Sequence, residues 1–400
     1  MFVVDILVVV IVMALVFRSN RGIADKFGPM MAPWYKQNLD RLFLYHLFFS
    51  FIFPLVPGDA LGYWKFGFQQ VAVNSDRMSD YFGVGTIFLL WLNFIPVKLL
   101  GLSFLTGNIL YGVCGYLGLR YLFLLYVGSL KVNVKVMGLM VIPYLFYLPN
   151  MNFWTAGVGK DTLSFFGIAW FFYSLVHFRR MFIQLVLSIL LVYFIRPHMA
   201  LMLMLGTCLA IIFAREMKPV YKVLFLILAV GGFLVAYQKI AVFLMVEDLS
   251  VHSLSGLAKD KASSLASKGI GSAVDITNYS IPLRLFTYLY RPLIFDVHNL
   301  ITFMSFLENV VYMVTTVIGF RSIRWRDLPA IPMWLKAGFI TFLTAMIVFS
   351  NSLGNLGIIM REKNMTMIYF PMICIWAYSQ RKMEVFARRP PRTPIPSPST

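Results

Sequence analysis

The sequence predicts an all-α, polytopic integral membrane protein that forms a single helical bundle. Of its 400 residues, 60% are hydrophobic and only 13% are charged, and its mean hydropathy is +0.77. Soluble proteins have roughly 45–50% apolar and about 25% charged residues. The hydrophobic residues also form long runs separated by short basic connectors, which is the pattern of membrane-spanning helices.

About eleven apolar runs are candidate transmembrane helices. Crossing the hydrocarbon core takes roughly 20 apolar residues, and shorter runs are accommodated by neighbouring helices or a thinner bilayer. A further stretch, 85–103, contains Pro96 and Lys98, so we expect a re-entrant or interfacial segment, or part of an extra hairpin. The expected spans are 2–17, 42–57, 105–128, 136–149, 164–178, 181–195, 199–213, 220–244, 300–320, 331–349 and 364–379.

Lysine and arginine predict the orientation of these spans. They gather in alternate connectors, as the positive-inside rule requires of cytoplasmic loops. If 85–128 crosses the membrane once, these connectors all lie in the cytoplasm, with the N-terminus outside and the C-terminus inside. The connectors are marked by Arg18, Arg21, Lys26, Lys36, Arg41, Lys131, Lys135, Arg179, Arg180, Arg215, Lys218, Lys222, Arg321, Arg324, Arg326, Arg381, Lys382, Arg388, Arg389 and Arg392.

Residues 1–380 are expected to form one transmembrane domain, with outer loops 58–84 and 245–299 covering an active site. The Pro/Ser/Thr-rich tail 381–400 is expected to be disordered and cytoplasmic. The net charge of +18 does not indicate a nucleic-acid partner, because the basic residues are spread over short connectors. The three cysteines lie in apolar runs without CxxC spacing and are expected to be inert thiols.

The predicted orientation places a small set of charged side chains on the outer side of the membrane. Ionisable groups at helix ends are costly to bury, so they usually pair with one another or line a polar cavity. We therefore expect a shared outward-facing cavity that contains acids, bases and arginines. The set is Asp59, Lys160, Asp161, Arg196, His198, Arg291, Asp296, His298, Arg361, Glu362 and Lys363.

Three of these residues are candidates for catalysis, and each has a structural alternative. Asp59 follows Pro57-Gly58, so it is either a turn or helix-capping residue, or a general base or metal ligand. Asp161 follows a Gly-x-Gly turn and is either a helix N-cap or part of the site. His198 is either structural or active in proton transfer.

The cations also allow two interpretations. Arg196 either extends its guanidinium to the interface or binds a phosphate oxygen through its planar fork. Arg361 and Glu362 belong to a basic cluster on the outer side, where basic residues are normally sparse, which favours a functional role. Glu308-Asn309 lies inside an expected span and either forms a helix–helix hydrogen bond or lines a cavity.

Several short motifs resemble those of known membrane enzymes. Asp59-Ala-Leu-Gly-Tyr63-Trp64 resembles the acidic outer loop of the GT-C class of lipid-linked glycosyltransferases. The stretch 149–161 and the Arg196-Pro197-His198, Arg291-Pro292 and Arg361-Glu362-Lys363 steps are similar to segments of proteins that serve polysaccharide export. The overall layout is similar to that of O-antigen polymerases of the Wzy type.

This resemblance implies a GT-C-like glycosyltransferase in the bacterial cytoplasmic (inner) membrane. Its substrate would be an undecaprenyl-diphosphate-linked glycan, polymerised on the outer face, with a chain-length regulator as a further partner. Asp59, then His198, would be the base, with Asp161 as a further catalytic residue. No cofactor is implied unless Asp59 binds Mg²⁺ or Mn²⁺. Substrate contacts are expected from Lys160, Arg196, Arg291, Arg361, Glu362, Trp154, Tyr63 and Trp64.

Two other functions stay open at this stage. The same cations would serve a transporter or flippase that binds a lipid-linked saccharide without making a bond. A non-catalytic component of a polysaccharide export complex is the other alternative.

Overall fold

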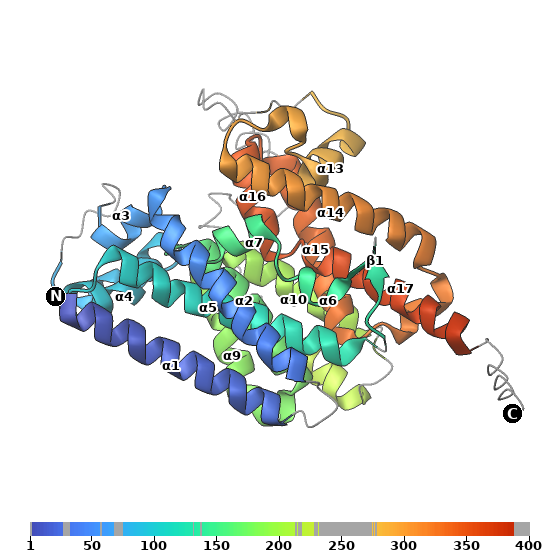
Figure 1. Cartoon of the computed structure of the whole chain (residues 1–400), viewed down its shortest axis with the longest axis horizontal. Coiled ribbons are helices and arrows are strands. Elements are labelled where there is room, and N and C mark those ends of the chain that lie inside the picture. The colour runs from blue at the N-terminus through green and yellow to red at the C-terminus, as the bar shows by residue number, and fades with distance from the viewer. Residues whose placement is uncertain are drawn as a thin grey trace, which may run out of the picture.

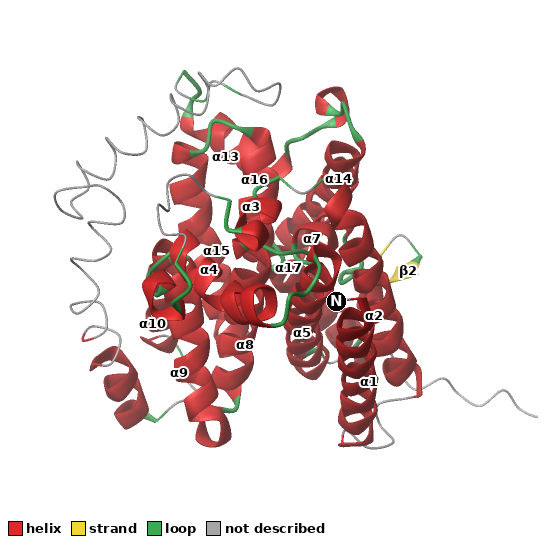
Figure 2. Ribbon diagram, turned by 90° about the vertical axis from the view of Figure 1, so that its left-hand side faces the viewer, coloured by secondary structure: helices red, strands yellow, loops and turns green. Residues whose placement is uncertain are grey.

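The computed structural model confirms the all-α class (Figures 1 and 2). In the described part of the chain, the β-structure is one short hairpin of β1 (Lys135–Val136) and β2 (Leu139–Met140). The structure describes residues 2–26, 33–56, 58–67, 75–130, 132–136, 138–212, 214, 218–227, 231, 274, 276 and 278–387.

Five described helices are long and apolar enough to cross a membrane. Two shorter apolar helices accompany them, α10 (Pro197–Ile212) and Thr86–Leu99, in which α4 (Thr86–Phe94) continues into the π-helical η3 (Ile95–Leu99). Together these helices indicate a multi-pass membrane protein. The five are α1 (Phe2–Lys26), α5 (Phe104–Ser129), α9 (Phe178–Ile195), α14 (Leu300–Ser322) and α15 (Met333–Ser352).

These helices pack side by side in one bundle (Figure 1). α2 (Pro33–Ile52) packs on α1 and α5, and α8 (Lys160–Val176) packs between α5 and α9. α10 packs on α15, and α17 (Tyr369–Ala387) packs on α14. The core is rich in fully buried aromatic rings, including Phe172 and Tyr369, whose ring centroids lie 5.2 Å apart.

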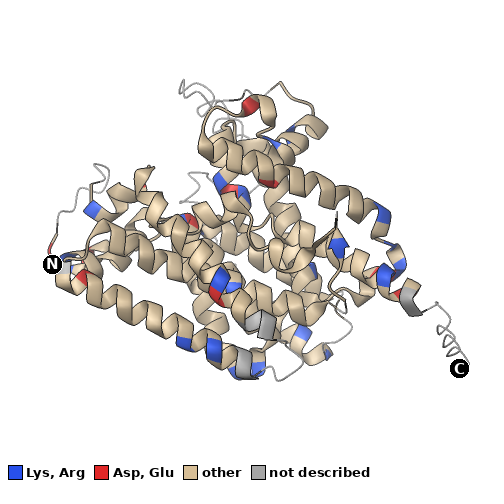
Figure 3. Ribbon diagram, viewed as in Figure 1, with Lys and Arg blue, Asp and Glu red and all other residues tan. Residues whose placement is uncertain are grey.

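Basic residues concentrate at one end of the bundle, where α1, α14 and α17 end (Figure 3). Two connectors are tied together there, because Arg324 in the turn after α14 donates to both carboxylate oxygens of Glu384 in α17, at 2.9 and 2.8 Å. These residues belong to the connectors that the sequence predicts to lie on one side of the membrane.

The expected span 136–149 is not a transmembrane helix. After the hairpin, the chain forms α6 (Val141–Tyr144), an irregular turn and α7 (Pro149–Trp154). Pro143 and Pro149 lack the N–H that a continuous helix needs. Side chains replace the missing backbone partners, because Asn152 Nδ2 donates to the carbonyls of Phe146 and Leu148, at 2.9 and 2.8 Å.

Two further expectations need adjustment, and two others fall mostly outside the described residues. The span 42–57 begins earlier and ends at Ile52, since α2 covers Pro33–Ile52. Residues 381–387, expected in the disordered tail, continue α17, and 388–400 lie outside the described residues. Most of the span 220–244 and of the outer loop 245–299 also lies outside them, although that loop ends in α13 (Ile281–Tyr290) and η4 (Ile294–Asp296).

Candidate functional site

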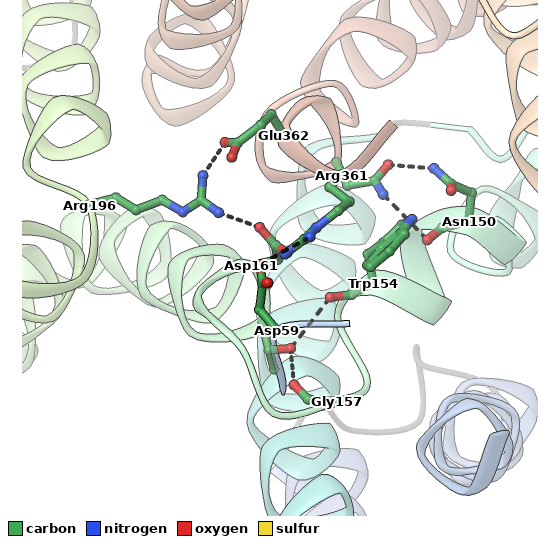
Figure 4. A network of polar contacts seen from close by, with 10 residues as sticks. Asp59, Asn150, Trp154, Gly157, Asp161, Arg196, Arg361 and Glu362 are labelled. Atoms are coloured by element: carbon green, nitrogen blue, oxygen red, sulfur yellow. Dashed lines mark hydrogen bonds and ion pairs between the residues drawn. The ribbon is translucent and has the colours of Figure 1, made fainter. Parts of the chain in front are cut away.

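Charged side chains from four separate segments of the chain meet around the start of α8 (Figure 4). Asp59 precedes α3 (Ala60–Lys65), and Lys160 and Asp161 begin α8. Arg196 joins α9 to α10, and α16 (Leu356–Glu362) supplies the remaining arginine and carboxylate. We call this set the charged cluster: Asp59, Lys160, Asp161, Arg196, Arg361 and Glu362.

Asp161 is the centre of the charged cluster. Its residue is only 3% exposed, and its two carboxylate oxygens accept from two arginines. Arg196 Nη2 lies 2.5 Å from Oδ1, and Arg361 Nε and Nη2 lie 3.1 and 3.0 Å from Oδ2. A buried carboxylate with this many charge-assisted hydrogen bonds is held ionised and fixed in place.

Arg196 bridges two carboxylates. One guanidinium nitrogen donates to Asp161 and the other, Nη1, donates to Glu362. Burial disfavours the charged guanidinium, but the two carboxylates outweigh this effect and raise the pKa of Arg196. Arg196 is only 7% exposed and both of its Nη atoms are occupied, so it lies behind the site rather than at its surface.

Arg361 lies at the mouth of the charged cluster. Its Nη1 is 3.8 Å from Asp59 Oδ2, and its guanidinium carbon lies 4.8 Å from the centroid of the Trp154 ring. The Asp161 carboxylate raises the pKa of Arg361 against the opposing effect of burial. The side chains of Arg361 and Asp59 are 28% and 58% exposed, so a ligand can reach both.

Lys160 adds a second accessible cation. Its ammonium lies 5.8 Å from the centroid of the Tyr63 ring, which belongs to α3. The charged cluster thus holds three carboxylates and three cations, with two aromatic rings beside its more accessible cations. The indole Nε1 of Trp154 is buried and has no hydrogen-bond partner among the described residues.

The capping alternatives for the two aspartates fail. Gly159, not Asp161, occupies the N-cap position of α8. Asp59 does occupy the N-cap position of α3, but its side chain makes no capping hydrogen bond. Helix capping therefore explains neither aspartate. Asp59 is the more exposed of the two, with 58% of its side chain accessible against 4% for Asp161.

Three expected site residues lie outside the charged cluster. Trp64 is 3% exposed, packs in the core against Gly107 and donates to the Leu102 carbonyl at 3.3 Å, so it is not a sugar platform. Arg291 pairs with Asp296 in its own turn, at 3.0 and 2.5 Å. The ring of His198 lies beside Phe349 of α15, with centroids 6.0 Å apart.

A second buried polar network lies next to the charged cluster. Glu308 of α14 accepts from the Met151 N–H at 3.0 Å and from the Tyr312 hydroxyl. Lys363 is fully buried, and its Nζ donates to Asn309 Oδ1 at 2.6 Å and to the Arg291 carbonyl at 3.2 Å. Burial lowers the pKa of Lys363 to about 7, although the nearby Glu308 favours its charged form.

Sequence reasoning placed Lys363 on the outer side together with Arg361 and left the role of Glu308 open. The structure resolves the latter as a helix-packing contact, since its partners lie on α7 and within α14. A signal for this network is present in the sequence, because Asn150 and Asn152 fall in an otherwise apolar run. Asn150 Nδ2 donates to Asn364 Oδ1 at 3.1 Å and so ties α7 to the segment that follows α16.

The carboxylates of the charged cluster are held by arginines rather than facing one another. Among the described residues, no group of three or more His, Cys, Asp or Glu side chains has the arrangement of a metal site.

No protein-family model matches this chain, and no curated protein or solved structure is significantly similar to it.

Proposed function

We propose that the chain is a membrane glycosyltransferase of GT-C-like type that polymerises a polysaccharide from undecaprenyl-diphosphate-linked units. The observation that supports this best is the exposed Asp59 carboxylate beside Arg361, with Lys160 close to the same surface. Transfer of a sugar from a lipid diphosphate needs a base for the acceptor hydroxyl and cations for the leaving group. The charged cluster has a carboxylate and a cation side by side and exposed, in Asp59 and Arg361.

In the proposed reaction, Asp59 takes the proton of the acceptor hydroxyl as its oxygen forms a bond to the anomeric carbon. The bond from that carbon to the diphosphate oxygen breaks, and the diphosphate leaves with the electron pair. Arg361 and Lys160 stabilise the negative charge that develops on the diphosphate. The partly exposed Trp154 ring faces the sugars, and the buried Tyr63 ring lies behind Lys160.

Arg196 and Asp161 have a positioning role in this proposal. Arg196 is held by two carboxylates, and Asp161 fixes Arg361 through two hydrogen bonds. They set the direction of the Arg361 guanidinium without touching the substrate. Glu362 completes this support because it balances the second side of Arg196.

The test is Asp59→Asn in cells that make the polymer, with Asp76→Asn as the matched control. Asp76 is a carboxylate in the same expected loop, 58–84, and its side chain is 99% exposed. Loss of a general base lowers rates by about 10²- to 10⁴-fold. We expect long chains to disappear and single repeat units to accumulate with Asp59→Asn at normal protein levels, and no change with Asp76→Asn. Normal chain length in both variants would remove the proposal.

One observation favours a transporter or flippase as the second candidate. The chain between α5 and α8 forms only short elements. The same holds after α15, where the short helix α16 is followed by the 3₁₀ turn η6 (Lys363–Met365). Interrupted helices near a substrate site are a feature of transporters. A transporter predicts that labelled lipid-linked saccharide fails to reach the outer leaflet without the protein, whereas a polymerase predicts normal arrival and no polymer.

A further inference from the structure

A cavity opens away from the charged cluster, where α5 and α8 end and α15 begins. Its volume is about 550 Å³. That volume lies within the range of about 300–1,000 Å³ that is usual for small-molecule sites. Gly128, Tyr173, His177 and Trp334 are among the residues that line it, so it lies between α5, α8 and α15.

The walls of this cavity are amphipathic. Leu124, Leu125 and Leu175 provide apolar surface. The Tyr173 and His177 rings lie 4.6 Å apart, and His177 Nδ1 donates to the Tyr173 carbonyl at 2.9 Å. Trp334 Nε1 donates to Ser129 Oγ at 3.0 Å. Aromatic side chains with one polar edge are typical of the boundary between hydrocarbon and headgroups.

Two arginines lie next to the rim of this cavity in the sequence. Arg179 and Arg180 come after His177 and Phe178, which both line the cavity, and both arginines are exposed. The Arg180 N–H donates to the His177 carbonyl at 2.9 Å, which places this arginine in the turn at the rim. An apolar cavity with arginines beside it complements a lipid whose headgroup is an anion.

We propose that this cavity binds one acyl chain of an anionic glycerophospholipid, with the lipid phosphate at Arg179 and Arg180. The acyl chain of the lipid lies against Gly128 and the three leucines of the wall. The ester groups of the lipid lie between His177 and Trp334. The tail 388–400 is a poor rival, because its own arginines would be repelled by Arg179 and Arg180. This site is separate from the charged cluster and does not depend on the function proposed for it.

Gly128 allows the cavity to be filled without disturbing the fold. A Cβ atom at Gly128 would meet nothing within 4 Å, and the residue lies in the last turn of α5. Leucine is also a better helix former than glycine. Gly22 of α1 is the matched control, since it is helical, exposed and equally open.

The experiment measures lipid binding to the full chain by native mass spectrometry. The probes are phosphatidylglycerol and phosphatidylethanolamine with identical acyl chains. We expect phosphatidylglycerol to bind more tightly, Gly128→Leu to abolish this binding, and Gly22→Leu to leave it unchanged. Thermal unfolding of each variant checks that it is folded.

The headgroup contact is tested by the double variant Arg179→Gln/Arg180→Gln. Losing two arginines near a lipid headgroup is expected to weaken phosphatidylglycerol binding by about 30-fold, and phosphatidylethanolamine binding by less, because its ammonium group offsets the charge of its phosphate. Arg18→Gln/Arg21→Gln, two exposed arginines of α1, is the control. Equal binding of the two lipids, or equal effects of the two glycine variants, would overturn the proposal. So would phosphatidylglycerol binding that appears only when residues 388–400 are removed, because the tail would then be the occupant.

Discussion

Replacing Asp161 by asparagine tests whether the charged cluster is a preformed unit. The substitution keeps the shape of the side chain and removes its charge. Asp161 is 3% exposed and accepts three hydrogen bonds from Arg196 and Arg361, so the change leaves two arginines short of one carboxylate. Breaking a buried ion pair costs about 3–5 kcal/mol. We expect about 3 kcal/mol, at the low end of that range, because Glu362 still pairs with Arg196.

The assay is the free energy of unfolding in mixed lipid–detergent micelles, measured by titration with a denaturing detergent. The matched control is Glu384→Gln, which removes a carboxylate that also binds an arginine through both oxygens but is 39% exposed. We expect little change there, because water and salt screen exposed pairs. If the two variants lose the same free energy, the cluster is not a buried, interdependent network and the positioning role of Arg196 fails.

Three further predictions follow from the packing and the charges. Gly115→Ala should destabilise the protein by about 1–3 kcal/mol, because the added Cβ would lie 1.9 Å from the Thr155 carbonyl oxygen. The control Gly22→Ala should be neutral or stabilising, and unfolding titrations of both variants measure the difference. Trp154→Ala should weaken substrate binding by about 5- to 30-fold and Trp154→Phe by less, since Phe keeps a ring beside Arg361; equal losses in a binding titration would contradict the ring contact. Burial acts to raise the pKa of Asp296, but Arg291 and the Leu293 N–H outweigh it and lower that pKa, so this turn is stabilised above the unfolded pKa of about 3.9 and loses stability as pH falls through the lower folded value. Hydrogen-exchange protection of the Leu293 amide should therefore fall on acidification, and Asp296→Asn should remove that pH dependence.

The charged cluster was predictable because most of the chain is apolar and suited to the hydrocarbon of a bilayer. In an apolar chain, charges at helix ends are stable only when they meet one another. Asp59, Asp161, Arg196 and Arg361 could therefore be expected to meet, although they lie far apart in the sequence. It did not predict which arginine binds which carboxylate, because that depends on how the four segments are positioned by packing.

Hydropathy alone failed where proline decides the local structure. The stretch 136–149 is as apolar as a true span, yet Pro143 and Pro149 break it into short pieces. Trp64 and Tyr63 are adjacent in sequence and both are buried in the core, but only Tyr63 also has its ring beside Lys160. The sequence contains both aromatics and no sign of which one faces the site.

Four consecutive residues, 361–364, serve both polar networks. Arg361 and Glu362 reach the charged cluster, and Lys363 and Asn364 reach α14 and α7. Each residue of a helix is turned by about 100° from the one before it, so this division depends on register as well as on residue type. Deleting or inserting a single amino acid here would exchange the partners of every side chain in the segment. This stretch should therefore tolerate conservative substitutions far better than any change in its length.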